Sequence, residues 1–224
     1  MTLTCLIPAY NEAARIAAVL QAVLNHPLID EVIVIDDGSA DATARVVAGF
    51  PAARLIALPH NLGKTAALAR GLDAASGDLI LLVDADLVGL AAHHLTALIT
   101  PVRDGHADMS ISLRDNAPFL WRWIGLDYIS GERTLRKSLL AAHHLTLTTL
   151  PKFGFEVFLN SLCVTSAARI HVARWPGVIS PLKSQKYGFR AGVLADLKML
   201  RDLFQAVPPL GLLRQIVKMR RLRV

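Results

Sequence analysis

Apolar and polar positions follow two alternating periods along the first half of the chain. Short runs of consecutive apolar residues, such as LILLV at 79–83, alternate with longer segments in which apolar residues recur every three or four positions. The short runs predict strands buried on both faces, and the longer segments predict amphipathic helices. Strands are expected at 3–10, 31–39, 53–59, 78–87 and 107–113, and helices at 11–24 (with Asn11 as N-cap), 41–50, 61–76 and 89–104. This order predicts right-handed βαβ units and an α/β fold with a Rossmann-like, doubly wound, mostly parallel sheet.

The regular alternation ends after Arg114, and the rest of the chain has a different pattern. An irregular connector, helical and strand-like segments and a basic C-terminal tail follow in turn. They are expected as a connector at 116–131, helices at 132–144 and 155–167, a strand at 169–175, and two amphipathic helices within 189–224 whose polar faces are mostly cationic.

The length of 224 residues and these patterns predict one main domain with an appended tail. The domain is expected to span 1–188, divided into halves at about 1–114 and 115–188. The basic amphipathic helices at 189–224 are expected to follow it as a separate C-terminal segment.

The composition is apolar for a globular protein, with 53% hydrophobic residues and a mean hydropathy of +0.43. The longest apolar stretches are well short of the roughly 20 residues needed to cross a bilayer. Strands of a buried sheet therefore explain the excess better than membrane insertion does. The N-terminal segment reads directly as a strand, so no leader peptide is expected.

A net charge of +6 favours anionic partners such as phosphorylated small molecules or an acidic membrane surface. Aromatic residues make up only 6% and are not interleaved with basic ones, which argues against nucleic acid as a partner. Cys5 and Cys163 lie far apart, in apolar contexts and without a Cys/His cluster. This cysteine usage indicates a reducing, cytoplasmic compartment and no structural zinc.

Three expected strands end in polar residues: PAYNE at 8–12, DDGS at 36–39 and DAD at 84–86. Ligands of parallel α/β sheets bind beyond the carboxyl ends of the strands, so these groups are expected to meet at one edge. In an extended backbone, residues i and i+2 point the same way, and Asp84 and Asp86 can therefore face one cavity. Two carboxylates at this spacing suit Mg²⁺ or Mn²⁺ bridging a diphosphate. For either aspartate alone, a helix N-cap is the competing interpretation.

The segments IPAYNEAARIAAVL, EVIVIDDGSADAT and NLGKTAALARGLDAASGDLILLVDADL resemble, in this order and spacing, the family 2 glycosyltransferases with the GT-A fold. The resemblance covers roughly the first half of the chain. It implies a metal-dependent hexosyltransferase that uses a UDP- or GDP-linked sugar. In that case Asp36 supports a turn, Asp37 accepts a hydrogen bond from the nucleobase, and Asp84 and Asp86 hold ribose and metal. The implied donor-binding residues are Pro8, Ala9, Tyr10, Asn11, Glu12, Asp37, Lys64, Asp84, Ala85 and Asp86.

The second half looks like the polyprenyl-phosphate branch of that family. ADMSISLRD, ISGERTLRKSLL and KSQKYGFR are similar to its Ser-Arg, Ser-Gly-x-Arg and Gly-x-Ser-Lys segments, although Lys183 stands where that branch has glycine. The resemblance implies that Arg114, Arg133 and Lys186 bind the acceptor phosphate. Val88 replaces the glutamine that follows the acidic pair in some members.

The nature of the acceptor decides which catalytic groups are needed. A hydroxyl acceptor requires a general base, for which Glu156 is the first candidate and Asp127 and Glu132 are lesser ones. A phosphate acceptor is already ionised and requires cations instead. The cations of the second half favour the phosphate, with Asp84, Asp86, Arg133 and Glu156 as the catalytic set. Direct attack on the sugar would invert its anomeric configuration.

These inferences predict sugar transfer to a polyprenyl phosphate by a cytoplasmic protein that is peripheral at the inner face of the cell membrane. The alternatives are a soluble or saccharide acceptor, a non-catalytic sugar-nucleotide binder, and a receiver-like signalling module. The adjacent histidines at 93–94 and 143–144 are expected to be solvated or capping groups, because neighbouring helical positions point about 100° apart. His171 is a lesser candidate for a metal ligand.

Overall fold

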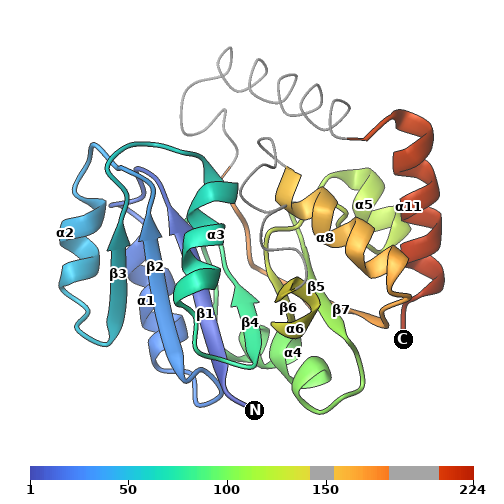
Figure 1. Cartoon of the computed structure of the whole chain (residues 1–224), viewed down its shortest axis with the longest axis horizontal. Helices are drawn as coiled ribbons and strands as arrows, with labels where there is room; N and C mark the ends of the chain where they lie inside the picture. The colour runs from blue at the N-terminus through green and yellow to red at the C-terminus, as the bar shows by residue number, and fades with distance from the viewer. Residues whose placement is uncertain (142–153, 182–206) are drawn as a thin grey trace.

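The computed structural model describes residues 1–141, 154–181 and 207–224. Within this part of the chain, seven strands form one sheet in the order β3-β2-β1-β4-β6-β5-β7 (Figure 1). Every neighbouring pair is parallel except the two pairs made by β6, which runs antiparallel to both β4 and β5. The strands are β1 (Leu3–Ala9), β2 (Glu31–Asp36), β3 (Ala53–Ala57), β4 (Leu79–Leu82), β5 (Met109–Arg114), β6 (Arg133–Arg136) and β7 (Ile170–Trp175). The predicted α/β class with a mostly parallel sheet is confirmed.

Helices cover both faces of the sheet, and the strands alternate their apolar side chains between the two layers. In β2, Val32 and Val34 belong to the core beneath one set of helices, and Ile33 and Ile35 belong to the core on the other face. One core packs against α1 (Ile16–Leu24), α2 (Thr43–Ala48) and α4 (Ala92–Arg103). The other packs against α3 (Lys64–Ala74), α5 (Phe119–Ile124), α8 (Gly154–Thr165) and α11 (Pro209–Arg221).

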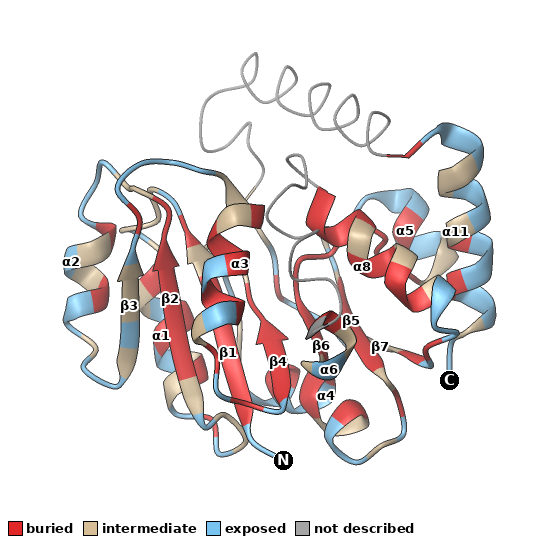
Figure 2. Ribbon diagram, in the orientation of Figure 1, coloured by how far each residue is buried: buried red, intermediate tan, exposed pale blue. Residues whose placement is uncertain are grey.

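The double burial explains why the central strands are almost uninterrupted apolar runs. β1, β2 and β4 are buried along nearly their whole lengths, whereas β3 at the sheet edge is more accessible (Figure 2). A parallel strand with helices on both sides has no solvated face that could carry polar residues. The high hydropathy of the sequence therefore reflects this sheet. Among the described residues, no helix combines the length and apolarity needed to cross a membrane.

The segment 132–144 was predicted as one helix, and this prediction is wrong for its first part. Arg133–Arg136 form β6, which inserts between β4 and β5 and pairs Leu81 with Thr134 and Ser110 with Thr134. Only the short α6 (Ser138–Ala141) follows it. The segment contains good helix formers, but pairing with two remote strands overrides this local preference.

Further differences from the prediction concern helices. The predicted helix at 11–24 begins at Ile16, and the N-cap position is occupied by Arg15 without a side-chain capping bond. The connector at 116–131 contains the short helix α5. Of the two predicted tail helices, α11 is present, while the first falls outside the described residues together with the predicted boundary at 188/189.

Candidate active site

A pocket of about 430 Å³ lies at the carboxyl ends of β1, β2 and β4, the strands that the sequence predicted to end in polar residues. It is lined by Pro8, Ala9, Tyr10, Glu12, Asp37, Asn61, Leu62, Gly63, Lys64, Thr65, Ala66, Asp84, Ala85, Asp86 and Glu156. All of the predicted donor-binding residues except Asn11 are in this set, so three strand ends and the start of α3 converge on one cavity.

The two aspartates after β2 hold the loops around the pocket. The carboxylate of Asp37 accepts hydrogen bonds from the backbone amides of Leu62 (2.7 Å) and Gly63 (2.8 Å), which fixes the loop before α3. Asp36 accepts from the backbone amide of Ser39 at 3.1 Å, which confirms its predicted role in supporting the turn. Gly38, which follows Asp37, has a φ of +68°, and a Cβ there would meet the backbone of His60 at 2.5 Å. Only glycine suits this close approach.

Asn11 supports the same loop instead of capping a helix. Its side-chain oxygen accepts a hydrogen bond from the backbone amide of Ala40 at 2.9 Å, and its backbone amide donates to the hydroxyl of Ser39 at 2.9 Å. The backbone of Asn11 is left-handed, with φ +56°, a conformation that asparagine tolerates better than most residues. Asn11 therefore ties the end of β1 to the turn after β2 and does not itself line the pocket.

Lys64, the first residue of α3, lies between two carboxylates in the pocket. Its ammonium contacts Asp84 at 2.7 Å and Glu156, from α8, at 2.9 Å. Burial by itself would lower the pKa of Lys64, but the negative charges of Asp84 and Glu156 outweigh it and raise this pKa above its usual value. The lysine is therefore a permanent cation that joins the two halves of the predicted domain.

The backbone at Gly131 packs against this ion pair. A Cβ at position 131 would come within 2.6 Å of the Lys64 ammonium and 2.8 Å of both Asp84 carboxylate oxygens. The connector before β6 thus forms one wall around Asp84, and any side chain there would push the ion pair aside.

Asp86 is held from the segment that follows β7. Its carboxylate accepts a hydrogen bond from the hydroxyl of Ser180 at 3.1 Å, and the carbonyl of Ser180 accepts from the side-chain amide of Asn116 at 2.6 Å. Val88 and Ile179 also pair as a β-bridge. These contacts fix the acidic pair against the second half of the chain.

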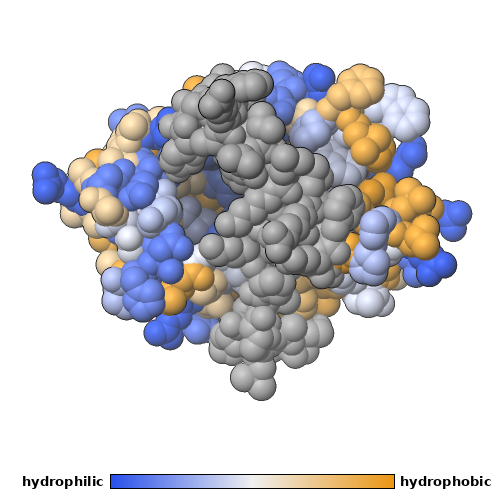
Figure 3. All heavy atoms as spheres, turned by 90° about the horizontal axis from the view of Figure 1, so that it is seen from above, coloured by the Kyte–Doolittle hydropathy of each residue, from blue (hydrophilic) through white to orange (hydrophobic). Residues whose placement is uncertain are grey.

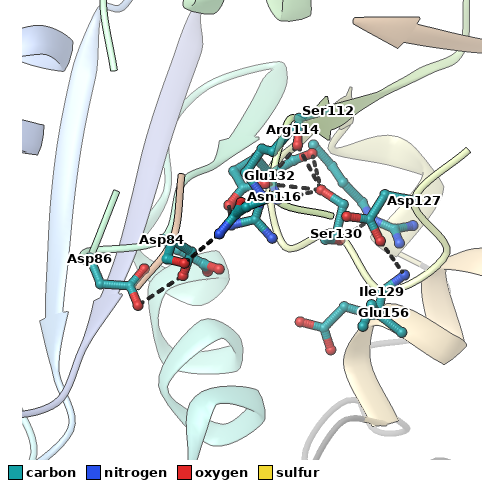
Figure 4. Close-up of polar contacts among 12 residues, drawn as sticks. Asp84, Asp86, Ser112, Arg114, Asn116, Asp127, Ile129, Ser130, Glu132 and Glu156 are labelled. Atoms are coloured by element: carbon teal, nitrogen blue, oxygen red, sulfur yellow. Dashed lines mark hydrogen bonds and ion pairs between the residues drawn. The ribbon is translucent and has the colours of Figure 1, made fainter. Parts of the chain in front are cut away.

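A buried polar cluster lies beside Asp84, where β5 meets the connector (Figure 4). Glu132 contacts the guanidinium of Arg114 at 3.2 Å and accepts from the hydroxyls of Ser112 (2.6 Å) and Ser130 (3.0 Å). Burial opposes the charge of Arg114, but the negative charges of Glu132, Asp84, Asp127 and Asp86 together outweigh it and raise the pKa of Arg114. Arg114 is therefore close enough to the acidic pair to act on it electrostatically.

Asp127 also belongs to this region, and its surroundings disfavour the charged form of its carboxyl group. It is fully buried, and burial raises its pKa to about 6 despite the nearby Arg114. Its Oδ1 accepts from the backbone amide of Ile129 at 3.2 Å. Asp127 is not exposed to solvent and does not line the pocket. Its position therefore does not suit a general base, the role for which the sequence made it a lesser candidate.

The structure contradicts the predicted phosphate contact of Arg133. Its side chain is fully buried and its guanidinium donates to the carbonyls of Ser130 (2.9 Å) and Tyr128 (3.2 Å) and to the side chain of Asn160 (2.7 Å). The physical reason is that β6 directs this side chain into the core between β5 and α8. The other predicted acceptor ligand, Lys186, lies outside the described residues.

The sequence profile of glycosyl transferase family 2 matches residues 4–161 of the chain. The chain belongs to glycosyl transferase family 2. The match begins in β1 and ends in α8, and so it includes every residue that lines the pocket. This membership excludes the receiver-like interpretation of the acidic strand ends.

Curated relatives of this family 2 chain differ in the acceptor that their names specify. It is 29% identical over 180 residues to a dolichyl-phosphate beta-glucosyltransferase of Dictyostelium discoideum, covering 72% of this chain and 49% of that protein. It is 37% identical over 114 residues to glucosyl-3-phosphoglycerate synthase of Mycobacterium tuberculosis, covering 46% of this chain and 35% of that protein. The chain thus spans about half or less of the length of these two relatives.

A solved structure supports the fold. Glucosyl-3-phosphoglycerate synthase of Mycobacterium tuberculosis, crystallised with Mn²⁺ and UDP-glucose, superposes with a TM-score of 0.65 and 26% identity, covering 88% of this chain and 77% of that one. Another of its crystal structures contains Mn²⁺, UDP and glucosyl-3-phosphoglycerate. The predicted GT-A assignment is thereby confirmed.

Sequence reasoning missed several residues of the pocket in this family 2 chain. Asn61, Leu62 and Gly63 line it beside Lys64, and they belong to the same NLGK motif that singled out the lysine. Ser180 was also missed, because no local pattern connects it with an aspartate that lies 94 positions earlier in the sequence.

None of the described histidines lines the pocket, and the pair at 143–144 lies outside the described residues. His94 is buried near the start of α4, where its ring accepts from the amide of Ala91 at 3.1 Å and contacts the carbonyl of Pro176 at 3.1 Å, so it is one of the capping groups expected. His171 lies on the edge strand β7, where burial and then the charge of Arg223 lower its pKa. It is not among the residues that line the pocket.

The carboxylates at the end of β4 suit a metal ion that also binds oxygen atoms of a substrate. Among the described residues, no group of three or more His, Cys, Asp and Glu side chains is arranged to hold a metal ion by itself. Asp84 and Asp86 nevertheless present carboxylate oxygens at one strand end. Mg²⁺ and similar ions commonly bind one or two carboxylates and complete their shell with phosphates and water. The pocket therefore fits a metal that arrives with a diphosphate.

Proposed function

We propose that the chain is a glycosyltransferase that moves a sugar, with inversion, from a UDP- or GDP-linked donor to a polyprenyl phosphate at the inner face of the cell membrane. One observation carries the proposal: the loop after β1, Asp37, Lys64, the Asp84–Asp86 pair and Glu156 all line a single pocket. Its volume of about 430 Å³ lies within the range of small-molecule sites. The family membership and the Mn²⁺ and UDP-glucose of the structural neighbour support the same assignment.

In this proposal the nucleotide lies against the carboxyl ends of β1 and β2, and the diphosphate faces the end of β4. Asp84 and Asp86 hold Mg²⁺ or Mn²⁺, which when bound supplies positive charge to the departing nucleoside diphosphate. Asp37 offers its remaining lone pairs to the nucleobase. Ser180 orients the carboxylate of Asp86 through its hydroxyl.

Lys64 has two tasks in the proposed reaction. Its ammonium holds the carboxylates of Asp84 and Glu156 in place, at 2.7 and 2.9 Å. As a preorganised cation it also stabilises negative charge that develops in the pocket during transfer. The raised pKa ensures that it stays protonated while doing so.

A phosphate acceptor needs positioning by cations and not a general base. Arg114 is the described candidate on the acceptor side, because it lies near the acidic pair while Glu132 fixes its orientation. Lys186, which is outside the described residues, is proposed as a second phosphate ligand, and Arg133 is not retained. The dolichyl-phosphate relative supports this acceptor class.

A soluble phosphorylated acceptor is the second candidate. The specific observation in its favour is the solved neighbour that contains glucosyl-3-phosphoglycerate. A hydroxyl acceptor would require a base, and Glu156 is the carboxylate in the pocket that could serve. In that case the contact with Lys64 would have to loosen when the acceptor binds.

Radiolabelled nucleotide sugars presented with undecaprenyl phosphate or with 3-phosphoglycerate separate the two candidates. The proposal predicts label in the organic phase, dependent on Mn²⁺ or Mg²⁺, with the lipid acceptor. Label that appears only in a water-soluble product would overturn the lipid acceptor and favour the second candidate. A chain that binds donor but transfers no sugar to either acceptor would be the non-catalytic binder.

A further inference from the structure

Helix α5 exposes large apolar side chains that a stable fold would normally bury. Phe119 and Trp123 are 74% and 75% exposed, and Leu120 is 52% exposed. Only Trp121 of this helix is buried, where it packs in the core shared with α8 and α11. The outer face of α5 is therefore apolar without having any partner among the described residues.

Helix α11 continues this surface with a second pattern. Its inner face is anchored in the core by Ile216 and Met219. On its outer face, Leu210, Leu213 and Val217 are exposed at helical spacing and form an apolar stripe. Arg214, Lys218 and Arg221 are exposed beside them, also at helical spacing, and form a basic stripe.

The two helices lie side by side at one end of the molecule (Figure 1). The segments that follow the two helices approach each other: a Cβ at Gly125, just after α5, would lie 3.0 Å from the guanidinium of Arg223, just after α11. Tyr128 also donates to the side chain of Gln215 in α11. Seen from above, hydrophobic side chains gather over this end of the molecule (Figure 3). We call the exposed residues Phe119, Leu120, Trp123, Leu210, Leu213 and Val217 the apolar patch.

Helix α5, which carries half of the patch residues, lies at the same end of the sheet as the pocket. α5 follows the carboxyl end of β5, which runs parallel to β7 at the far side of the same sheet, and the carboxyl ends of β1, β2 and β4 bound the pocket. The N-terminal half of α11, which carries Leu210 and Leu213, lies beside α5 at this end (Figure 1).

The charged residues on the segments that carry the patch have one sign. The segments 116–126 and 207–224 contain no acidic residue, and their basic residues are Arg122, Arg214, Lys218, Arg220, Arg221 and Arg223. Exposed apolar patches of this kind mark interaction surfaces. Apolar residues with tryptophan beside arginine and lysine suit the interface of a bilayer with anionic lipids, where the rings enter the headgroup region and the cations meet phosphate.

We propose that the apolar patch and its basic border dock the protein onto an anionic lipid surface. The inference rests on the membrane location in the proposed function and adds the surface that makes the contact. In this arrangement, the end of the sheet that carries the pocket lies towards the lipid. It assigns α5, and not the C-terminal tail alone, to the contact.

Sedimentation of the full chain with phosphatidylcholine vesicles, with and without phosphatidylglycerol, tests the proposal. The wild type should sediment with the anionic vesicles and stay in solution with the neutral ones. Arg214→Glu/Lys218→Glu should lower the partition coefficient by more than about tenfold, since each basic residue near an anionic surface contributes several-fold in binding. The matched control Arg45→Glu/Arg70→Glu changes net charge equally at exposed positions on α2 and α3, and should bind as the wild type does.

Trp123 provides a second readout that a purely electrostatic attraction would not move. It is highly exposed, whereas Trp121 and Trp175 are buried, so vesicle binding should shift the fluorescence to the blue through Trp123 alone. Trp123→Phe should keep sedimentation and lose most of the shift, and Trp123→Ser should weaken both. Circular dichroism of each variant checks folding.

Three results would overturn the proposal. The wild type could fail to sediment with anionic vesicles, or the control pair could lose binding as strongly as Arg214→Glu/Lys218→Glu. The chain could instead be a dimer in light scattering that Trp123→Ser converts to a monomer, which would assign the patch to a second copy. None of these depends on donor binding or transfer, so they are distinguishable from failure of the proposed function.

Discussion

The ion pair of Lys64 and Asp84 shows how closely the second half of the chain is fitted to the nucleotide half. The pair comes from α3 and from the end of β4, but its surroundings are supplied by Glu156 and by the backbone at Gly131. A motif search finds Lys64 and Asp84 because they lie in patterned segments. It does not find Gly131 as part of the site, because the closeness arises only when the connector folds over the strand end.

Replacing Gly131 by alanine tests this fit. The added Cβ would lie 2.6 Å from the Lys64 ammonium and 2.8 Å from the Asp84 oxygens, so one or both groups must move. We expect metal-dependent affinity for the nucleotide to fall by about tenfold or more, since small displacements of site groups are costly. Calorimetric titration with UDP and Mn²⁺ measures this. Gly49→Ala, at the end of α2 with an ordinary helical φ of −71°, is the control and should bind normally.

Asp127 predicts a pH dependence of stability. Its folded-state pKa of about 6 lies above the ordinary value of 3.8, because burial disfavours the charged form. Above about pH 6 the folded protein must hold this carboxylate ionised at a cost of up to about 3 kcal/mol, and protonation removes the cost as the pH falls towards 4. Asp127→Asn should therefore raise the unfolding free energy at pH 7–8 and change it little near pH 4. Urea unfolding across this range measures the difference, and an equal effect at both pH values would contradict the assignment.

At the scale of elements, the alternating half of the fold could be predicted from the sequence and the β6 region could not. Strands such as β2 and β4 can be recognised in the sequence as apolar runs, because helices cover both faces of the sheet. β6 has the sequence Arg-Thr-Leu-Arg, whose polar residues look like a solvated helix. Its environment is set by pairing with β4 and β5, which are remote in sequence. The assignment of Arg133 to a phosphate failed for the same reason.

Replacing Arg133 by leucine separates the structural role from the role that the sequence suggested. The carbonyl of Ser130 and the side-chain oxygen of Asn160 would lose the donor that Arg133 supplies in a fully buried place, and the carbonyl of Tyr128 would keep only the side-chain amide of Asn160. We expect the unfolding free energy to fall by about 3 kcal/mol or more, as for other broken buried networks. At a temperature where the variant is folded, KM for the acceptor should be unchanged. A raised KM with unchanged stability would restore the phosphate-ligand interpretation.

At the scale of the molecule, the pocket proposed to bind the donor lies at the carboxyl ends of the central strands, and α5 and α11 carry the apolar patch at one end of the molecule (Figures 1 and 3). Arg114 lies between them in the chain, because it ends β5 ahead of α5 and pairs with Glu132 near the acidic pair. A family 2 protein with a lipid-linked acceptor would need such a connection between the donor pocket and the surface that meets the lipid.

We propose that the pocket binds a nucleoside diphosphate together with a divalent cation held by Asp84 and Asp86. Thermal unfolding of the wild type and of Asp86→Asn, with UDP or GDP, with and without Mn²⁺, tests it most directly. Saturating ligand at about 100 times its dissociation constant stabilises the folded state by about 2.7 kcal/mol, which corresponds to a rise of several degrees for a chain of this size. We predict this rise for the wild type only when nucleotide and Mn²⁺ are both present, and its loss in Asp86→Asn while Asp104→Asn, an exposed carboxylate after α4, keeps it. An equal rise without Mn²⁺, or an undiminished rise in Asp86→Asn, would contradict the account.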